Sequence, residues 1–136
     1  MRKVSVLIGA CMLVALALTL VAQTEQELPP IMKDVGATSA SMRMNLMNGA
    51  AEEVAKDAQK LQGNFTKAMG IFKALKAQDA VDMAKANADA AGEIVKAAKA
   101  NNLDAAKAPA ATIQGSCKSC HAVHREQLPD KTYKFK

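Results

Sequence analysis

The chain has 136 residues, half of them hydrophobic, and 18 Lys and Arg against 13 Asp and Glu give a formal net charge of +5. This length predicts a single domain. The basic residues are spread along the chain instead of being gathered in one patch, so the charge does not indicate a nucleic-acid-binding surface.

The N-terminal segment, residues 1–22, has the pattern of a secretory signal peptide. A basic start is followed by an uncharged run over residues 4–22, and the chain turns polar at Gln23. This order predicts export to the periplasm and cleavage at the end of the run. The run is also long enough to cross a bilayer, so an uncleaved membrane anchor is the alternative. Cleavage would remove Cys11, and residues 23–136 form the predicted domain.

Two helices are predicted in the first half of this domain. One runs over about residues 30–47 and is closed by Asn48-Gly49, because glycine is the usual residue past a helix end. The next runs over about residues 50–76, and its apolar residues recur every three or four positions along one face. That face comprises Val54, Ala58, Leu61, Phe65, Ala68 and Phe72.

Two further helices are predicted in the second half. The third begins with Asp79 as its N-cap, ends near residue 100 and carries an alanine-rich face. The fourth runs over residues 103–127, with Asn102 as its N-cap. The tail after Pro129 is expected to be loosely held, and no strand pattern is present. Four helices with short connections predict an all-α fold, an antiparallel up-down-up-down four-helix bundle.

The fourth helix carries Cys117-Lys118-Ser119-Cys120-His121 near its end. Two cysteines three apart, followed at once by histidine, are the haem attachment signature of c-type cytochromes. Positions i, i+3 and i+4 lie on one helix face, so both thiols and the imidazole can meet one flat macrocycle. The thiols would add to the haem vinyl groups, and His121 would be an axial iron ligand. The motif therefore predicts one covalent haem c.

Two other interpretations of the motif are weaker. A thioredoxin-like dithiol needs a preceding strand, and the pattern before Cys117 is helical. A zinc site could use His124 as a fourth ligand. On a straight helix, however, Cys117 and His124 are about 10 Å apart along the axis, and zinc ligands lie only ~2.0–2.3 Å from the metal. Four ligands from one helix therefore cannot close a tetrahedron.

The up-and-down order of the helices predicts which other residues lie near the haem. The start of the first helix is level with the motif, which places Met32 near the haem. Counting along the second and third helices at ~1.5 Å per residue puts Phe65, Met69 and Asn87 at about haem height. Asn87 could hydrogen-bond a ligand there, although a solvated helix position is the simpler expectation.

The chain resembles the cytochrome c-prime family, the class II c-type cytochromes. The resemblance implies that Cys117 and Cys120 are the thioether links and that His121 is the proximal ligand. It also implies that Arg125 tunes the iron. The residues that carry the resemblance are Asn102-Leu103-Asp104, the motif from Cys117 to His121, Arg125, and the segment Met32-Lys33-Asp34-Val35-Gly36-Ala37.

The same resemblance places Met32, with Val35 and Gly36, on the distal side of the haem, where an apolar side chain usually covers the sixth iron site. This chain also departs from the family. Leu28 stands where the family has an arginine, which puts one propionate or distal contact in doubt. His124, expected as a partly exposed helix residue, stands where Tyr or Phe is common. The aromatic positions of the third helix are taken by Ala and Asn.

These features predict a periplasmic cytochrome that transfers single electrons through Fe(III)/Fe(II) cycling, with periplasmic redox proteins as partners. No catalytic constellation is present, so an enzyme is not expected. If the Met32 sulfur reaches the iron, the haem is six-coordinate with a raised potential. If Met32 only packs, the haem is five-coordinate, and the alternative function is binding of nitric oxide or carbon monoxide. The resemblance also implies that a homodimer can form.

Overall fold

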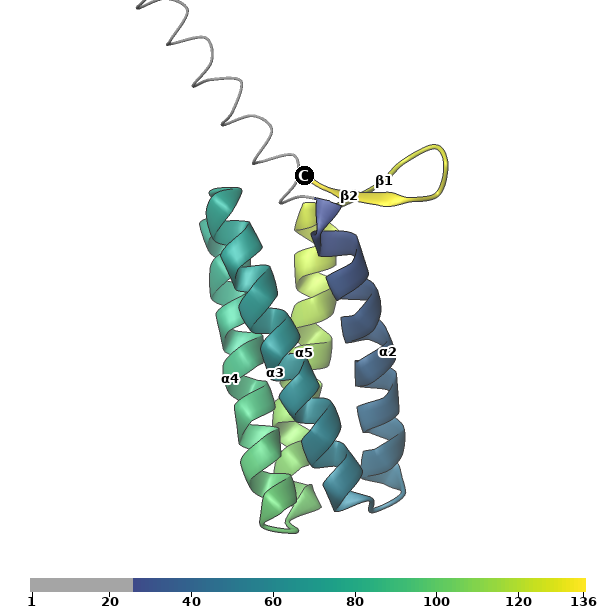
Figure 1. The fold of residues 1–136 in the computed structure, drawn as a ribbon, viewed down its shortest axis with the longest axis vertical. Helices are drawn as coiled ribbons and strands as arrows, with labels where there is room; N and C mark the ends of the chain where they lie inside the picture. The colour runs from purple at the N-terminus through teal and green to yellow at the C-terminus, as the bar shows by residue number, and fades with distance from the viewer. Residues whose placement is uncertain (1–25) are drawn as a thin grey trace, which may run out of the picture.

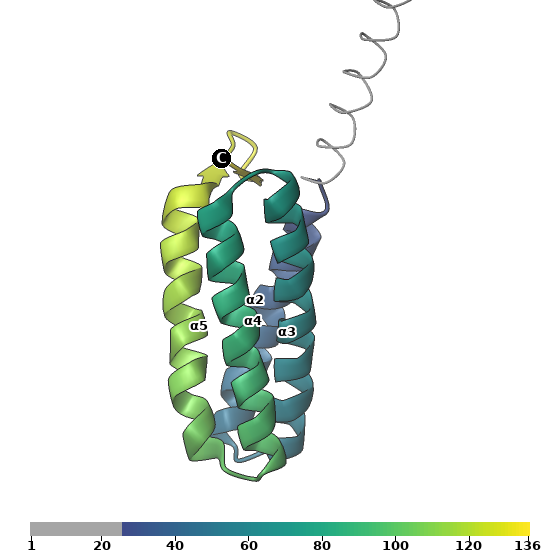
Figure 2. The ribbon, with the colours of Figure 1, turned by 90° about the vertical axis from the view of Figure 1, so that its left-hand side faces the viewer.

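The computed structural model describes residues 26–136, so the predicted signal peptide or anchor over residues 1–22 lies outside the described residues. Four helices run alternately up and down (Figures 1 and 2), which confirms the all-α four-helix bundle. None of the described helices is long and apolar enough to cross a membrane. The helices are α2 (Leu28–Met47), α3 (Ala51–Ala74), α4 (Gln78–Lys99) and α5 (Leu103–His124).

The three turns between helices share one conformation. Each contains a residue in the left-handed region, namely Gly49 (φ 72°), Lys76 (φ 59°) and Asn101 (φ 53°). The following amide then bonds back across the helix end, as in the 3.0 Å bond from the Ala50 nitrogen to the Asn45 carbonyl oxygen. This pattern satisfies carbonyls that have no partner within the helix. The short turns thus force successive helices to run antiparallel.

Replacing glycine by alanine should change stability in opposite directions at two positions. Gly49→Ala is expected to destabilise the fold by about 1 kcal/mol, because a side chain disfavours the left-handed conformation. Gly63→Ala is the matched control: Gly63 lies within α3, and a Cβ there meets nothing within 4 Å. It should stabilise the fold by about 0.5–1 kcal/mol. Denaturant unfolding measures the change in the free energy of unfolding in each variant. A change of the same sign in both would contradict the left-handed turn at Gly49.

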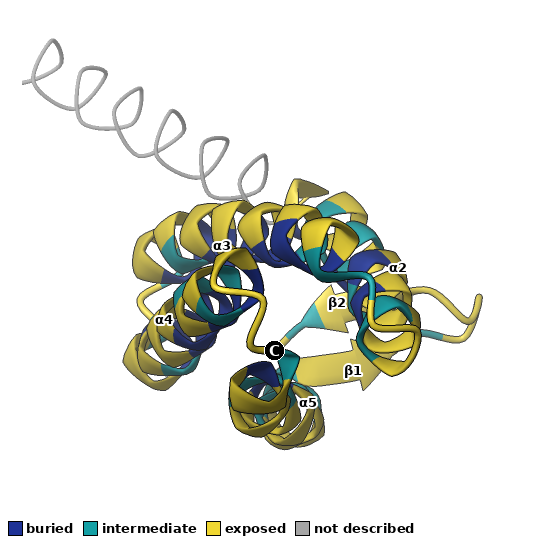
Figure 3. Ribbon diagram, turned by 90° about the horizontal axis from the view of Figure 1, so that it is seen from below, coloured by how far each residue is buried: buried dark blue, intermediate teal, exposed yellow. Residues whose placement is uncertain are grey.

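The predicted apolar faces form the core. All six residues of the predicted face of α3 are buried. The predicted alanine-rich face of α4 is also buried except for the half-buried Val95; it comprises Val81, Ala84, Ala88, Ala91, Val95 and Ala98. Figure 3, coloured by burial, shows the buried residues on the inward side of the helices. A separate apolar cluster lies at the end of the bundle where α2 and α4 begin. Its buried members are Leu28, Ala68, Ile71, Phe72, Ala80, Val81 and Ala84.

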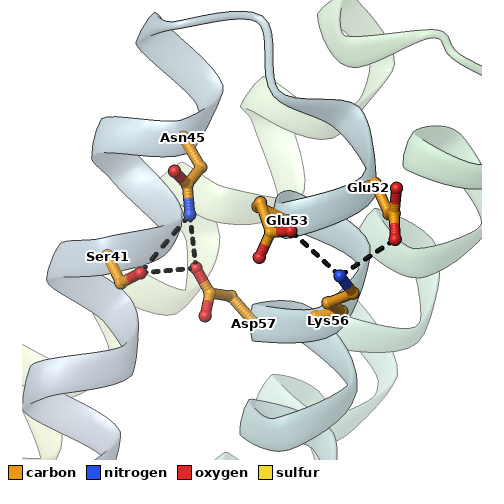
Figure 4. Close-up of polar contacts among 6 residues, drawn as sticks. All are labelled: Ser41, Asn45, Glu52, Glu53, Lys56 and Asp57. Carbon is orange, nitrogen blue, oxygen red and sulfur yellow. Dashed lines mark hydrogen bonds and ion pairs between the residues drawn. The ribbon is translucent and has the colours of Figure 1, made fainter.

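Polar contacts attach α2 to α3. Asp57 of α3 accepts hydrogen bonds from Ser41 Oγ (2.8 Å) and Asn45 Nδ2 (2.9 Å), as Figure 4 shows. One end of α2 is therefore held by a single carboxylate. Nearer its start, Asp34 accepts from Lys60 Nζ (2.6 Å) and Asn64 Nδ2 (2.7 Å). Because α2 barely touches α5, these contacts hold the first helix in place beside a gap in the packing.

The end of the chain differs from the prediction. Helix α5 ends at His124, and strands β1 (Arg125–Gln127) and β2 (Tyr133–Phe135) form an antiparallel hairpin. The fourth helix was therefore predicted correctly except for residues 125–127, whereas the loosely held tail and the absence of strands were wrong. Asp130 stabilises the turn by accepting from the Thr132 amide (2.9 Å) and hydroxyl (2.6 Å). Such a local side-chain turn competes with the helix.

The two predicted helix caps have different outcomes. Asn102 caps α5 as predicted, because its Oδ1 accepts from the Ala105 amide at 3.2 Å. The prediction for Asp79 was wrong: α4 begins at Gln78, and its N-cap residue Ala77 provides no side-chain cap. Asp79 lies within the first turn, which leaves its carboxylate free to reach toward α5.

Candidate functional site

A cleft of ≈ 1560 Å³ lies between α2 and α5. Small-molecule pockets usually measure roughly 300–1,000 Å³, so this cleft has room for a large cofactor. Helices α3 and α4 contribute its back wall through Phe65, Phe72, Met83, Ala84 and Asn87. The hairpin lines the end near the last turn of α5, and in Figure 3 its strands extend from α5 toward α2.

The motif of α5 faces this cleft. Cys117, Cys120 and His121 all line it and are half-buried. Both cysteines are free thiols. Burial raises the pKa of each thiol, and Cys117 and Asp79 raise that of Cys120 further. A thiol with a raised pKa is protonated at neutral pH and is a poor redox nucleophile, so the thioredoxin-like interpretation gains no support.

His121 is held in the form that binds metals. Burial lowers the pKa of its imidazole, and the positive charge of Arg125 lowers it further. The neutral ring is therefore favoured, and only the neutral ring can donate a lone pair to iron. Arg125 itself has extended backbone instead of continuing the helix, and its guanidinium lies 4.1 Å from the centroid of the Tyr133 ring.

Helix α2 supplies the opposite wall. Met32, Val35 and Gly36, the residues expected on the distal side of a haem, line the cleft. Met32 is half-buried and packs against the apolar cluster at the start of α2 and α4. Leu28 belongs to that cluster, so the position that carries arginine in the resembled family is part of the apolar packing. No atom lies within 4 Å of a Cβ built on Gly36, and this segment of the wall is open.

The back wall contains two of the three residues predicted at haem height. Phe65 and Asn87 line the cleft and are 3% and 4% exposed. Met69 does not line the cleft; it packs against the apolar cluster instead. Phe72 takes the place predicted for Met69. Its position on the same apolar face of α3 as Phe65 was a sequence signal for this, because residues seven apart lie on one helix face.

Asn87 is the polar group of this back wall. The expectation that it is solvated was wrong, since it is buried and its Oδ1 has no hydrogen-bond partner. Ser39 of α2 also lines the cleft, and its Oγ is buried and without a partner. Buried polar atoms are nearly always paired, and these two unpaired atoms belong to residues that line the cleft from opposite walls.

His124 connects α5, α4 and the hairpin. It was expected to be a partly exposed helix residue, yet its side chain is only 11% exposed. Its Nε2 lies 2.7 Å from Asp79 Oδ2, and its Nδ1 lies 3.2 Å from the main-chain oxygen of Lys136. Both partners are acceptors, so both bonds form together only when both ring nitrogens carry protons. Phe135 stacks on His124 and on Phe72, with ring centroids 4.9 and 5.2 Å apart.

Residues 26–136 contain no group of three or more His, Cys, Asp and Glu side chains arranged to hold a metal ion. The zinc interpretation, which needs four such ligands, gains no support from these residues. A haem iron needs fewer protein ligands than zinc, because the porphyrin provides four ligands and the chain provides only the axial ones. Neither protein-family models nor curated protein sequences match this chain, so its likeness to the cytochrome c-prime family rests on the motif residues quoted above.

Proposed function

We propose that this protein is an exported periplasmic c-type cytochrome that carries one covalent haem and transfers single electrons. The observation that carries the proposal is the common orientation of Cys117, Cys120 and His121 into one large cleft. The attachment motif alone is a sequence pattern. Its three reactive groups on the wall of a cleft with room for a porphyrin make up a site.

The residues around the cleft fit such a group. Cys117 and Cys120 would form the thioether bonds, and the neutral ring of His121 would be the proximal ligand. Val35, Phe65 and Phe72 offer apolar contacts to the macrocycle. Lys33, Arg125 and Lys134 line the same cleft and are exposed, so they are suited to bind the carboxylates of the haem. When bound, the haem supplies a reversible one-electron couple at iron.

A redox titration of the purified full-length protein tests this function. We expect a red protein whose haem stays attached after denaturation and whose visible spectrum changes with a single reversible one-electron step. One haem per chain should be found by pyridine haemochrome assay. A colourless protein, or a bound haem that shows no reversible one-electron step, would contradict electron transfer.

A second candidate function is binding of nitric oxide or carbon monoxide, and the packing of Met32 favours it. Because Met32 packs against the apolar cluster, it can cover the iron without ligating it. Met32→Ala separates the two candidates. If the sulfur ligates the iron, this substitution removes a sulfur-to-iron charge-transfer band; if it only packs, the ferric spectrum stays high-spin in both proteins. A high-spin spectrum that shifts on adding either gas supports the binding function.

A further inference from the structure

We propose that the side-chain amide of Asn87 is the hydrogen-bonding contact for a small ligand at the open iron position, and that it gives this site affinity for small inorganic anions. This rests on the proposed covalent haem and concerns the chemistry of its sixth site. The resemblance implies an apolar cover there. The wall contributed by α4 is not wholly apolar.

The first argument is the burial of an unpaired amide. Asn87 is 4% exposed, lines the cleft, and its Oδ1 has no partner. Among the described residues its Nδ2 donates to no acceptor, and unlike Oδ1 it is not closed to solvent. Asn64, the comparable buried asparagine of α3, is satisfied by Asp34 at 2.7 Å. A buried amide with an unpaired end is costly, and the open Nδ2 is the end that can donate to a molecule in the cleft.

The second argument is the level of Asn87 along the bundle. The 2.7 Å bond between Asp79 and His124 marks one common level of α4 and α5. At ~1.5 Å per residue, Asn87 lies about 12 Å from that level, Cys117 about 10 Å and His121 about 4 Å. Side chains lean toward the N-terminus of their own helix. Because α4 and α5 are antiparallel, the side chains of Asn87 and His121 lean toward each other's level.

The third argument is the chemistry of the amide. An amide both accepts and donates, and rotation by half a turn exchanges the two ends. It can therefore accept from a water molecule in the resting protein and donate to an anion that replaces the water. Ser39 Oγ on the facing wall is unpaired but closed to solvent, so Asn87 is the amide or hydroxyl contact that we assign. Hydrogen-bond donors beside a haem decide which ligands bind.

Azide binding to the ferric protein tests the assignment, with carbon monoxide binding to the ferrous protein as the comparison. Carbon monoxide is a poor hydrogen-bond acceptor and reports access to the iron. In Asn87→Leu, which keeps the branched shape and the number of side-chain heavy atoms, azide affinity should fall by about tenfold or more. Carbon monoxide affinity should change by less than about threefold. Met69→Leu is the matched control, because Met69 packs against the apolar cluster and does not line the cleft; it should leave azide affinity unchanged.

Two results would overturn the assignment. One is equal azide affinity in the original protein and in both Asn87→Leu and Asn87→Ala; the other is a red protein whose ferric spectrum does not respond to azide. A colourless protein would instead overturn the proposed function itself. The vibrational frequency of bound carbon monoxide provides an independent readout, since removal of a nearby donor should raise it in Asn87→Leu but not in Met69→Leu.

Discussion

Replacing Cys117 and Cys120 together by alanine is expected to yield a protein that loses its haem on denaturation. Both thiols line the cleft, and in the double variant no covalent bond would hold the haem there. The folded state should also lose stability, because a group bound only to the native state stabilises it by about 4 kcal/mol when present at a thousand times its dissociation constant. That loss corresponds to a fall in melting temperature of about 10–20 °C.

Haem staining after denaturing electrophoresis and thermal unfolding measure the two effects. Ser119→Ala is the matched control within the same motif. Ser119 is exposed, and its hydroxyl bonds only to the Gly115 carbonyl oxygen of its own helix (3.3 Å); its replacement should leave both haem and stability unchanged. His121→Ala should keep the covalent haem but change its spectrum. Staining that persists in the double cysteine variant would contradict thioether attachment.

The helices could be predicted because their signals are local. Apolar spacing marks the buried faces, and Gly49 marks a turn that needs a left-handed residue. Lys76 and Asn101 adopt the same conformation without being glycine, so those turns were less evident in the sequence. The motif could be placed near the cleft because a helix displays positions i, i+3 and i+4 on one face.

What could not be predicted depends on contacts between residues far apart in sequence. Three-residue strands such as Tyr133–Phe135 are too short to show an alternating pattern. Phe135 is positioned by Phe72 and His124, and no local rule connects these three rings. The burial of Asn87 likewise depends on how α4 faces the cleft, because an asparagine on a helix is usually solvated.

Phe135→Ala is expected to release the hairpin from the bundle. The ring stacks on both Phe72 and His124, and each aromatic pair contributes about 0.5–1.5 kcal/mol beyond burial. Losing both contacts should increase the open population of the hairpin by roughly 10- to 100-fold. Limited trypsin digestion followed by mass spectrometry measures this, since Arg125, Lys131 and Lys134 are cleavage sites on the hairpin and cleavage follows the open population.

Val123→Ala provides the matched control, because Val123 is 52% exposed at the same end of α5 and should leave the digestion rate unchanged. If trypsin digests Phe135→Ala as slowly as the original protein, the stacked rings do not hold the hairpin. The global unfolding midpoint should change much less than the digestion rate, because the helices keep their own core.

The pH dependence of the hairpin follows from Asp79. The pKa of its carboxyl is lowered, chiefly by the hydrogen bond from His124. A group whose pKa is depressed by folding contributes stability above its unfolded value, about 3.9, and this is lost as the pH falls through the folded value. Trypsin is inactive in this acid range, so pepsin digestion is the suitable measurement. Release of the hairpin from the bundle should increase as the pH falls below about 4.

In Asp79→Asn the hairpin should open more readily at neutral pH and show less of this acid dependence. Equal acid dependence in the two proteins would mean that the carboxylate of Asp79 does not anchor the hairpin.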